Sequence, residues 1–460
     1  MPGGSARAAR WTLTRCACST CRRRMCWTTP TRPTTWRGCA GGYGMAEPCA
    51  GGDVLSYEAA LARLLAQAGA LPLETCATDD ATGRVLVEAV RARTPLPPFD
   101  NAAMDGYALR SGGRTITAGS VWPVAGRIVA GGAAPQVPAA AWEIMTGAAL
   151  PPGADSVVPY ERTERLDGAR MRVLEDIEPA RHIRRAGSDL RPDDLIAAAG
   201  TPVDATLRML LAAAGIARVQ VRRAPRVAIL STGDELVADA RAPLQAGQIR
   251  ASNGPFLQTA LGEAGAQVLA CRTLGDDPAQ FAAALAQVAV EADLVLTTGA
   301  VSAGAHDFVP AALDKAGAQP LFQGVAIRPG KPLLAARLAQ GSLLLGLPGN
   351  PVATVVGFRF FAVPLLRHWL GRPREQPLLA RLAEPVRGRG ALRGFLKAQV
   401  GHDADGALRV RVLAGQESFR IASLLQANAW ATVAPEAGEL PTGARVEVYP
   451  RDPDGRWRLE

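Results

Sequence analysis

The sequence predicts a multidomain α/β plus β protein with a parallel sheet in its central α/β domain. Three short apolar runs carry this prediction, because each ends in a glycine-containing turn and so indicates a buried strand that enters a loop. They lie at residues 226–235, 293–299 and 342–348. Helical patterns lie between them, at residues 253–265, 278–292 and 308–317. Strands that alternate with helices predict a parallel sheet covered on both faces.

In such a sheet, ligands bind beyond the carboxyl ends of the strands. All three glycine-rich turns are predicted at those ends, so we expect them to converge on one crevice. Glycine allows the backbone to approach an anion, and helix N-termini after such turns present free N–H groups. Each turn alone is equally well explained as a tight turn without a ligand, whereas three in one α/β unit favour an anion site.

Residues 1–52 differ from the rest of the chain in composition. The chain has a formal net charge of +9, and residues 1–46 contain eight arginines but no lysine, aspartate or glutamate. Six of the eight cysteines lie in this segment, but their spacing lacks the paired halves of a zinc module and no histidine is near. We interpret the segment as a disordered extension, or as upstream sequence translated ahead of a start near Met45; a zinc site is the alternative.

Four predicted domains follow. Apolar residues at helical spacing behind Ser56, and again at 201–215, predict helices on both sides of a stretch rich in glycine and proline. Alternating runs at 121–129 and 170–174 in that stretch predict strands. The domains are a discontinuous helical domain (53–90 and 191–222), an inserted β domain (91–190), the α/β domain (223–371) and a C-terminal β domain (372–460).

Composition also bears on partners and compartment. Beyond the arginine-rich segment the chain is nearly neutral, so its charge gives no reason to expect nucleic-acid binding. Charged residues or glycines interrupt every apolar stretch before the ~18 residues of a membrane-spanning helix, so we expect no membrane span. Cys76 and Cys271 are too few for a disulfide scaffold, so we expect a cytoplasmic protein.

Charged side chains stand at several predicted turns. Arg328 and Lys331 flank a Pro-Gly turn, which suits a clamp for an oxyanion, although a solvated basic turn is equally consistent. Acidic residues beside a phosphate site usually bind Mg²⁺ with waters retained. The candidates are Asp105, Asp234, Glu235, Asp277 and Asp307. A helix cap or turn role is the alternative for each, most clearly for Asp307, at the start of a predicted helix.

Several catalytic motifs are absent from the sequence. It contains no P-loop, no G-x-G-x-x-G at the start of the α/β unit, no H-E-x-x-H and no G-x-S-x-G. The four histidines are scattered, so a histidine triad or histidine-rich metal site is not expected. Chemistry here would rest on charge and positioning more than on a covalent nucleophile.

Six motifs in order resemble those of one enzyme family. They are Phe99-Asp-Asn-Ala-Ala-Met-Asp-Gly-Tyr-Ala108, Ile144-Met-Thr-Gly147, Ser231-Thr-Gly-Asp-Glu235, Gly299-Ala-Val-Ser-Ala-Gly304 with Asp307, Pro329-Gly-Lys-Pro332 and Leu347-Pro-Gly-Asn-Pro351. The chain resembles the molybdopterin molybdenumtransferases, the MoeA family, to which the gephyrin E domain also belongs. The resemblance covers about residues 54–450, and six motifs in order make it specific.

The resemblance implies a four-domain homodimer whose active site joins the α/β domain of one subunit to the inserted β domain of the other. The residues that would enter the partner's crevice are Asp105, Thr146, Arg184 and Asp189. The implied reaction inserts molybdate into adenylyl-molybdopterin with Mg²⁺, releases AMP and gives molybdenum cofactor, the last step of its biosynthesis. Implied partners are a molybdopterin adenylyltransferase and the molybdoenzyme apoproteins.

The resemblance also implies roles for individual residues. Molybdate would be held by Arg328, Lys331 and Ser418. Pterin and phosphate would be bound by Thr232, Gly299, Ser302 and Gly304, with Pro348, Asn350 and Pro351 in the same substrate site. Mg²⁺ and the scissile phosphoanhydride would be positioned by Glu235, Asp277 and Asp307. These three, together with Asp105 and Lys331, form the predicted catalytic set.

The sequence departs from the family pattern at several positions. Ala300 stands where relatives usually have a second glycine, Ser188 where they have glutamate, and Arg328 where they have lysine. The other departures are Ala353-Thr354 for a usual serine and Glu417 for the glycine before Ser418. Arg328 keeps the charge with a different donor geometry. Ala300 would be strained if its position requires a positive φ.

Other functions stay open at this point. A gephyrin-like scaffold or binding protein is one alternative, but the charged residues kept at the crevice favour an enzyme. A homologue that adenylylates molybdopterin is another, but such enzymes have a single α/β domain, and the two β domains here favour insertion. Tungstate has almost the same size and charge as molybdate, and the sequence does not separate the two.

Overall fold

The computed structural model describes residues 54–133, 135, 141–301, 307–452 and 457, all of which belong to one compact unit. The extension predicted at residues 1–52 lies outside the described residues, as do Ser302 and Gly304. Within the described part, none of the helices is long and apolar enough to cross a membrane.

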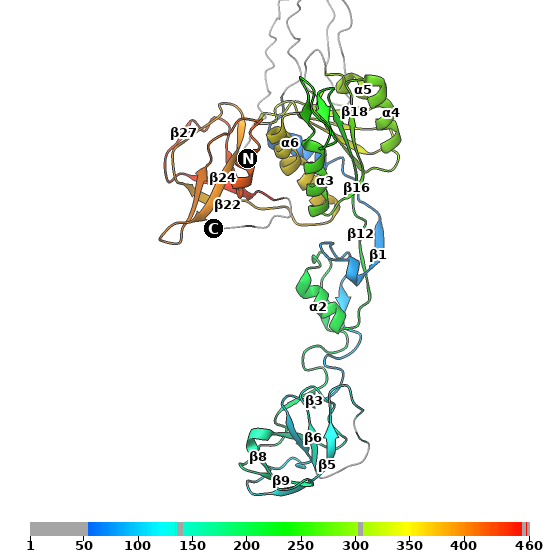
Figure 1. The fold of residues 1–460 in the computed structure, drawn as a ribbon, viewed down its shortest axis with the longest axis vertical. Helices are drawn as coiled ribbons and strands as arrows, with labels where there is room; N and C mark the ends of the chain where they lie inside the picture. The colour runs from blue at the N-terminus through cyan, green and yellow to red at the C-terminus, as the bar shows by residue number, and fades with distance from the viewer. Residues whose placement is uncertain (1–53, 134, 136–140, 302–306, 453–456, 458–460) are drawn as a thin grey trace, which may run out of the picture. The chain divides into compact units, whose positions relative to one another are not determined.

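The α/β unit is built on a six-stranded sheet in the order β16-β13-β17-β21-β20-β18 (Figure 1). Its strands are β13 (Arg226–Thr232), β16 (Gln267–Leu274), β17 (Leu294–Thr298), β18 (Gln319–Gln323), β20 (Leu334–Arg337) and β21 (Leu343–Leu347). The first four strands in this order run parallel to one another. The three strands predicted from the apolar runs are therefore confirmed as β13, β17 and β21.

The far edge of this sheet is antiparallel, which the prediction of a parallel sheet did not include. β20 runs antiparallel to both β21 and β18. Only residues 338–342 separate β20 from β21. Parallel neighbours need a crossover of about a dozen or more residues, so a connection this short permits only an antiparallel pair.

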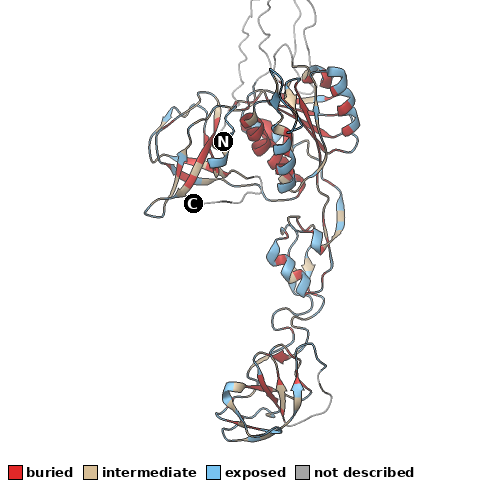
Figure 2. Cartoon of the chain, in the orientation of Figure 1, coloured by how far each residue is buried: buried red, intermediate tan, exposed pale blue. Residues whose placement is uncertain are grey.

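Helices cover both faces of the sheet. Along β13, Val227 and Ile229 point into one apolar core and Ala228 and Leu230 into another, as the two-residue period of a strand requires. The first core contains helix α3 (Asn253–Glu263). It also contains α6 (Pro351–Gly357) and α7 (Val363–Trp369), which the π-helical turn η3 (Phe358–Ala362) joins. The second contains α4 (Pro278–Val288) and α5 (Val309–Lys315). Figure 2 shows α4 and α5 with buried and exposed faces.

The first helix, α1 (Tyr57–Leu65), packs in the α/β core, not in the helical domain to which we assigned it. Ser56 is its N-cap as predicted, because its side chain accepts from the Ala59 N–H at 3.1 Å. The buried stripe of α1 includes Leu64, and the Tyr57 hydroxyl donates to the Phe360 carbonyl at 3.3 Å. The apolar face of an amphipathic helix packs against other apolar surface, which the helices on this face of the sheet provide.

The discontinuous segment that follows is mixed, so its description as helical is wrong. Besides α2 (Ala205–Ala213) and the turn η1 (Thr78–Asp80), it contains two antiparallel strand pairs. These are β1 (Leu73–Ala77) with β12 (Arg218–Arg222), and β2 (Val90–Arg91) with β11 (Leu195–Ala197). In β12, buried Val219 and Val221 alternate with more exposed polar side chains, which is the pattern of a half-buried strand.

The inserted β region forms a six-stranded sheet in the order β7-β4-β6-β5-β9-β8. Its strands are β4 (Gly106–Leu109), β5 (Val121–Ile128), β6 (Ala141–Ile144), β7 (Ser156–Pro159), β8 (Thr163–Arg165) and β9 (Arg170–Val173). The strands predicted at 121–129 and 170–174 are β5 and β9. A short turn, η2 (Tyr160–Arg162), and a pair of two-residue strands, β3 (Asn101–Ala102) and β10 (Ile183–Arg184), complete this region.

The C-terminal region is a closed β-barrel. Its strands are β22 (Leu378–Leu382), β24 (Arg393–His402), β25 (Leu408–Val412), β26 (Ala429–Val433) and β28 (Arg445–Pro450). The pairing of β24 with β26 closes the ring. The short pair β23 (Val386–Arg387) and β27 (Glu439–Leu440) and the helix α8 (Ala422–Gln426) accompany it. A two-residue strand of the α/β unit, β19 (Ile327–Arg328), adds to β24 in parallel.

Candidate active site

A cavity of about 620 Å³ lies at the carboxyl ends of β13, β17 and β21, where the three glycine-rich turns meet. The chain passes from β13 to β16 on one side of β13, and then to β17 on the other side. Ligands of open α/β sheets bind where the strand order reverses in this way. Six of the predicted site residues line the cavity: Thr232, Glu235, Gly299, Asp307, Asn350 and Pro351.

The turn after β17 contains two residues with positive φ. Gly299 has φ +91°, and a Cβ at this position would lie 2.5 Å from the Thr232 carbonyl oxygen, so only glycine fits. Ala300 follows with φ +50°, in the left-handed region. The departure from the family pattern at position 300 therefore places a Cβ where backbone strain is expected.

Hydrogen bonds tie the turns together. The Thr298 hydroxyl donates to Ser231 Oγ at 3.0 Å, and the Thr232 hydroxyl donates to the Thr298 carbonyl at 3.3 Å. The Asn253 side-chain amide donates to the Gly349 carbonyl at 2.8 Å and so joins the start of α3 to the Pro-Gly-Asn-Pro turn. These bonds hold the backbone of the cavity wall in a fixed arrangement.

The start of α3 also lies at the cavity. Ser252, Asn253 and Gly254 line the cavity, and no side chain caps this end of the helix. The first turn of α3 contains no acidic residue. Uncapped N–H groups at the start of a helix suit an anion. Sequence reasoning placed this helix correctly but did not assign Asn253 to the site.

The acidic residues divide between the cavity and structural roles. Glu235, Asp276 and Asp307 line the cavity. Asp277 does not, because its carboxylate caps α4 by accepting from the Ala279 and Gln280 N–H groups at 2.8 and 3.3 Å. Asp234 accepts from the Asp276 N–H at 2.9 Å and so shapes the turn after β16. The helix-cap role that the sequence left open for each acidic residue is thus the one that Asp277 has. Asp276 was not among the predicted residues.

The predicted cations Arg328 and Lys331 are absent from the described lining of the cavity. Both are exposed, Arg328 as the last residue of β19 and Lys331 on the turn that follows it. The Val325 N–H donates to the Lys331 carbonyl at 2.9 Å, and pairing of β19 with β24 fixes the other end of this turn. Their charges therefore stand on a turn anchored to the barrel.

A loop of the C-terminal barrel reaches the cavity. The Ser418 carbonyl accepts from the Val352 N–H of α6 at 2.9 Å, and Phe419 and Ile421 line the cavity. Pro348, at the end of β21, is buried and its carbonyl accepts from the Thr354 hydroxyl at 2.6 Å. Phe419 and Ile421 were not predicted, since nothing in the sequence brings the barrel loop to this end of the sheet.

Buried Lys397 holds this loop from behind. Its ammonium donates to the carbonyls of Gly415 and Arg420, the latter at 3.1 Å, and it is fully buried. Burial lowers the pKa of the Lys397 ammonium, although Glu417 acts in the opposite direction. The Gln416 side chain accepts from the Lys397 N–H at 3.0 Å and donates to its carbonyl at 2.9 Å.

Four predicted site residues lie on the inserted β region. The Thr146 N–H and hydroxyl both donate to Asp105 Oδ1, at 2.6 and 2.8 Å. The Thr146 N–H chiefly, then its hydroxyl, holds the pKa of the Asp105 carboxyl below its ordinary value. Arg184 pairs with Asn101 through β10 and β3, and the Asp189 N–H donates to the Leu96 carbonyl at 3.0 Å. All four side chains are exposed.

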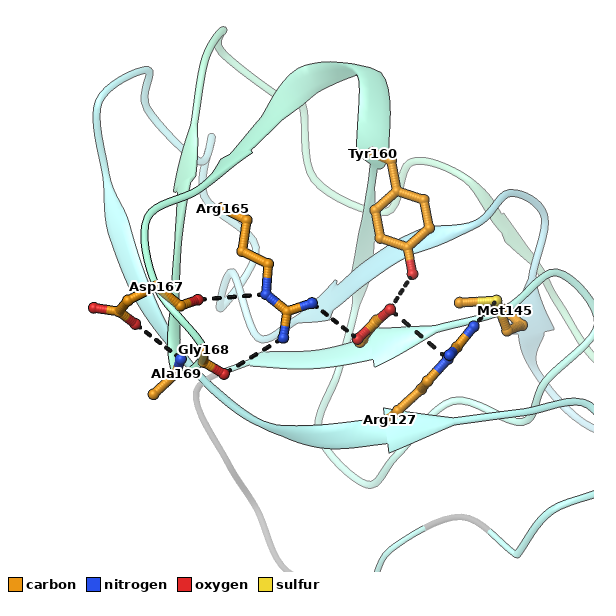
Figure 3. Close-up of polar contacts among 8 residues, drawn as sticks. Arg127, Met145, Tyr160, Arg165, Asp167, Gly168 and Ala169 are labelled. Atoms are coloured by element: carbon orange, nitrogen blue, oxygen red, sulfur yellow. Dashed lines mark hydrogen bonds and ion pairs between the residues drawn. The ribbon is translucent and has the colours of Figure 1, made fainter.

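A charged cluster lies beside the Asp105–Thr146 pair. The Tyr160 hydroxyl donates to Glu143 Oε1 at 2.7 Å, and Arg127 and Arg165 approach the same carboxylate at 3.7 and 3.9 Å. Figure 3 shows both guanidinium groups, with Arg127 also reaching Met145. Burial and then the hydrogen bond to Glu143 raise the pKa of Tyr160. Sequence reasoning did not single out this cluster.

Three family models match the chain: the MoeA N-terminal region (domain I and II) at residues 55–215, a probable molybdopterin binding domain at 228–368, and the MoeA C-terminal region (domain IV) at 379–451. Among solved structures, a molybdopterin biosynthesis MoeA protein from Pyrococcus horikoshii has a TM-score of 0.70 at 27% identity. That likeness covers 87% of this chain and 100% of the archaeal one.

Curated relatives cover the chain at higher identity. A molybdopterin molybdenumtransferase of Synechococcus elongatus is 39% identical over 407 residues, which is 86% of this chain and 99% of the relative. Molybdopterin molybdenumtransferase 2 of Mycobacterium tuberculosis is 38% identical over 388 residues, 80% of this chain and 93% of the relative. The three family models run through the α/β unit and both β regions. The chain therefore belongs to the molybdopterin molybdenumtransferases, a family of transferases in molybdenum cofactor biosynthesis.

Proposed function

We propose that the chain inserts molybdate into adenylyl-molybdopterin, releasing AMP and giving molybdenum cofactor. The cavity carries the proposal, because glycine-rich backbone, the start of α3 and the carboxylates of Glu235, Asp276 and Asp307 meet around it. Backbone N–H groups suit the phosphates of such a substrate, and carboxylates suit the cation that accompanies them. The names of the curated relatives support the same reaction.

Thr232, Gly299 and Asn350 are proposed to bind the pterin and phosphate groups, with Ser302 and Gly304 of the loop after β17. Pro348 and Pro351 fix the turn that carries Asn350. Because Gly299 has no Cβ, the turn after β17 can lie directly against Thr232, which brings two of these residues together at the cavity. Fixed donors of this kind lower the barrier without reorganising during the reaction.

Mg²⁺ fits the carboxylates of this cavity. Magnesium binds through one or two protein carboxylates plus substrate phosphates and keeps several waters, so Glu235 and Asp307 suffice to hold it. The described residues form no group of three His, Cys, Asp or Glu that could hold a metal ion on its own. Asp277 is left out, because its carboxylate caps α4. When bound, the cation would neutralise charge on the phosphoanhydride as AMP leaves.

Arg328, Lys331 and Ser418 are proposed to hold molybdate. The exposed side chains of Arg328 and Lys331 can present donors to a dianion, one as a planar fork and the other as a point charge. Ser418 belongs to the barrel loop that meets the cavity wall, and its carbonyl already accepts from Val352, which leaves its hydroxyl for the substrate.

We further propose that the active unit is a homodimer in the cytoplasm. Asp105, Thr146, Arg184 and Asp189 would enter the partner's crevice, and their exposure supports this. The proposed partners are a molybdopterin adenylyltransferase, which would supply the substrate, and molybdoenzyme apoproteins, which would receive the product. Retention of charged side chains at the cavity supports an enzyme over a gephyrin-like scaffold.

AMP release by the full-length chain tests this function. The chain would be incubated with adenylyl-molybdopterin, Mg²⁺ and molybdate, and both AMP and reconstitution of a molybdenum-dependent apoenzyme would be followed. We expect both signals from the wild type, loss of both in Asp307→Ala, and no change in Asp314→Ala, which removes an exposed carboxylate from α5. No AMP from a folded wild type favours the scaffold. Reconstitution only with tungstate and a tungsten-dependent apoenzyme favours the tungstate homologue.

A further inference from the structure

Arg127, on β5, presents an exposed guanidinium beside the Asp105–Thr146 pair. Its side chain is 59% exposed, and its contacts within the described residues are Met145 Sδ at 3.5 Å and the Glu143 carboxylate at 3.7 Å. A contact of 3.7 Å is an ion pair but too long for a hydrogen bond. Most of the five N–H donors of Arg127 are therefore available to a ligand.

Glu143 fixes where that guanidinium stands. Only 16% of the Glu143 side chain is exposed, and its carboxylate is held by the Tyr160 hydroxyl at 2.7 Å. Arg165 approaches the other carboxylate oxygen and donates hydrogen bonds to the carbonyls of Asp167 and Gly168, at 3.3 and 3.4 Å. Both arginines in Figure 3 are more than half exposed, but Arg165 donates to carbonyls of its own hairpin, whereas most donors of Arg127 have no hydrogen-bond partner within the described residues.

Strand register brings this cluster next to the proposed catalytic edge. Glu143 pairs with Arg127 on β5 and with Tyr107 on β4. Met145, which Arg127 contacts, directly precedes Thr146, whose N–H donates to Asp105. Arg127 is also close enough to contribute to the lowered pKa of Asp105. The Arg127 guanidinium thus contacts Met145, the residue before Thr146, and so lies near the proposed catalytic carboxylate of Asp105.

We propose that Arg127 is a substrate-contact residue that donates to an oxyanion of the reactants, and that Glu143 is its positioning residue. The inference rests on the proposed function, in which this edge meets an anionic substrate in the partner's crevice. Arginine presents two parallel donors to a phosphate or a molybdate oxygen pair, which gives direction as well as charge. Without Arg127, the carboxylates of Asp105 and Glu143 would meet an incoming anion with less compensating charge.

The test compares steady-state AMP release by the full-length wild type and its variants. Arg127→Ala removes the donors, and Arg127→Lys keeps the charge without the fork. Arg172→Ala is the matched control, because Arg172 is 43% exposed on β9 of the same sheet and pairs with Glu164 at 2.9 Å. Loss of one charge-assisted contact changes a KM about ten- to hundred-fold, so Arg127→Ala should fall in that range, with Arg127→Lys between it and the wild type.

The two substrates distinguish the source of the oxyanion. A rise in the KM for adenylyl-molybdopterin alone assigns the contact to a phosphate, and a rise in the KM for molybdate alone assigns it to molybdate. Glu143→Gln should raise the same KM, and the Arg127→Ala/Glu143→Gln double variant should be no worse than Arg127→Ala. All variants would be compared by circular dichroism and melting temperature.

Equal kinetics of Arg127→Ala and Arg172→Ala, in a wild type that releases AMP, would overturn the inference and leave the proposed function intact. Absence of AMP release by the wild type would instead reject the proposed function, and the inference with it. Additive effects of Arg127→Ala and Glu143→Gln would remove Glu143 as a positioning residue.

Discussion

At the residue scale, Thr146 lowers the pKa of the Asp105 carboxyl. The Thr146 N–H and hydroxyl favour the charged form of Asp105 and hold its pKa below the ordinary value. Thr146→Val removes the hydroxyl and keeps the N–H, so we expect the pKa of Asp105 to rise but not to reach that of a free aspartate. Carboxyl resonances followed by NMR through an acid titration measure it.

The same bonds set a pH window for stability. A carboxyl whose pKa is lowered on folding stabilises the fold above its unfolded pKa of about 3.9, and this contribution is lost as pH falls through the folded value. The acid-unfolding midpoint of Thr146→Val should therefore lie at higher pH than that of the wild type. An unchanged pKa of Asp105 would show that the N–H alone maintains it.

Adding a methyl group at position 299 and removing one at position 300 should change the free energy of unfolding differently. Gly299→Ala forces a Cβ to within 2.5 Å of the Thr232 carbonyl oxygen, so we expect a loss of about 1–3 kcal/mol in the free energy of unfolding. Ala300→Gly relieves a φ of +50° but gives the unfolded chain more freedom, so the expected change lies between zero and a gain of about 1 kcal/mol. Urea unfolding of both variants measures the contrast, and a clearly destabilised Ala300→Gly would contradict it.

At the scale of elements, Lys397 determines the conformation of the barrel loop at the cavity. Lys397→Met keeps the length and apolar stem but removes the ammonium that donates to the carbonyls of Gly415 and Arg420, so that one Ser423 hydroxyl, 3.2 Å from each, is left to serve both. We expect a loss of about 2 kcal/mol in the free energy of unfolding and a less ordered loop around Phe419. Hydrogen exchange at residues 415–421 and urea unfolding measure both effects.

Lys315→Met is the control for that substitution. Lys315 lies exposed in the last turn of α5, so its loss removes only a favourable charge at a helix end, worth about 0.3–1 kcal/mol. Equal destabilisation of the two variants would mean that the buried ammonium contributes nothing beyond its apolar stem.

Element by element, the sequence predicted what is locally encoded. Apolar runs that end in glycine turns located β13, β17 and β21, and Ser56 located the start of α1. It did not predict β20 as antiparallel, because strand direction there follows from the brevity of the 338–342 connection. Nor did it predict that α1 packs in the α/β core, because an apolar stripe indicates that a helix is packed but does not identify the surface it packs against.

The site was predictable to the same extent. Turn residues such as Thr232 and Gly299 line the cavity, because glycine turns at parallel strand ends must meet there. Asp277 was predicted for the site, but its carboxylate caps α4, and its neighbour Asp276 lines the cavity. Phe419 arrives through contact between regions distant in sequence, for which a single sequence carries no signal.

At the scale of the whole molecule, the proposed two-subunit site predicts complementation. Asp105→Ala would disable the β-domain side of each site, and Asp307→Ala the cavity side. Homodimers of either variant should be inactive, whereas a mixed dimer has one site with both sides intact. Random re-assembly of equal amounts should therefore restore about a quarter of wild-type AMP release.

Sedimentation would accompany this experiment to show that subunits have exchanged. The control mixes Asp105→Ala with Thr146→Ala, which alter the same side of the site and so should not restore activity. No recovery in exchanged Asp105→Ala and Asp307→Ala dimers would place both residues in a site contained within one subunit.

The packing of α1 has a consequence for synthesis on the ribosome. The helix is among the first described elements to emerge, yet its Tyr57 ring lies against Phe360, Phe361 and Phe395, which are translated long after it. Until those residues leave the exit tunnel, the apolar stripe of α1 has no native surface to cover it. The nascent chain must therefore carry this amphipathic segment unburied through most of its elongation, a period in which exposed apolar surface favours aggregation.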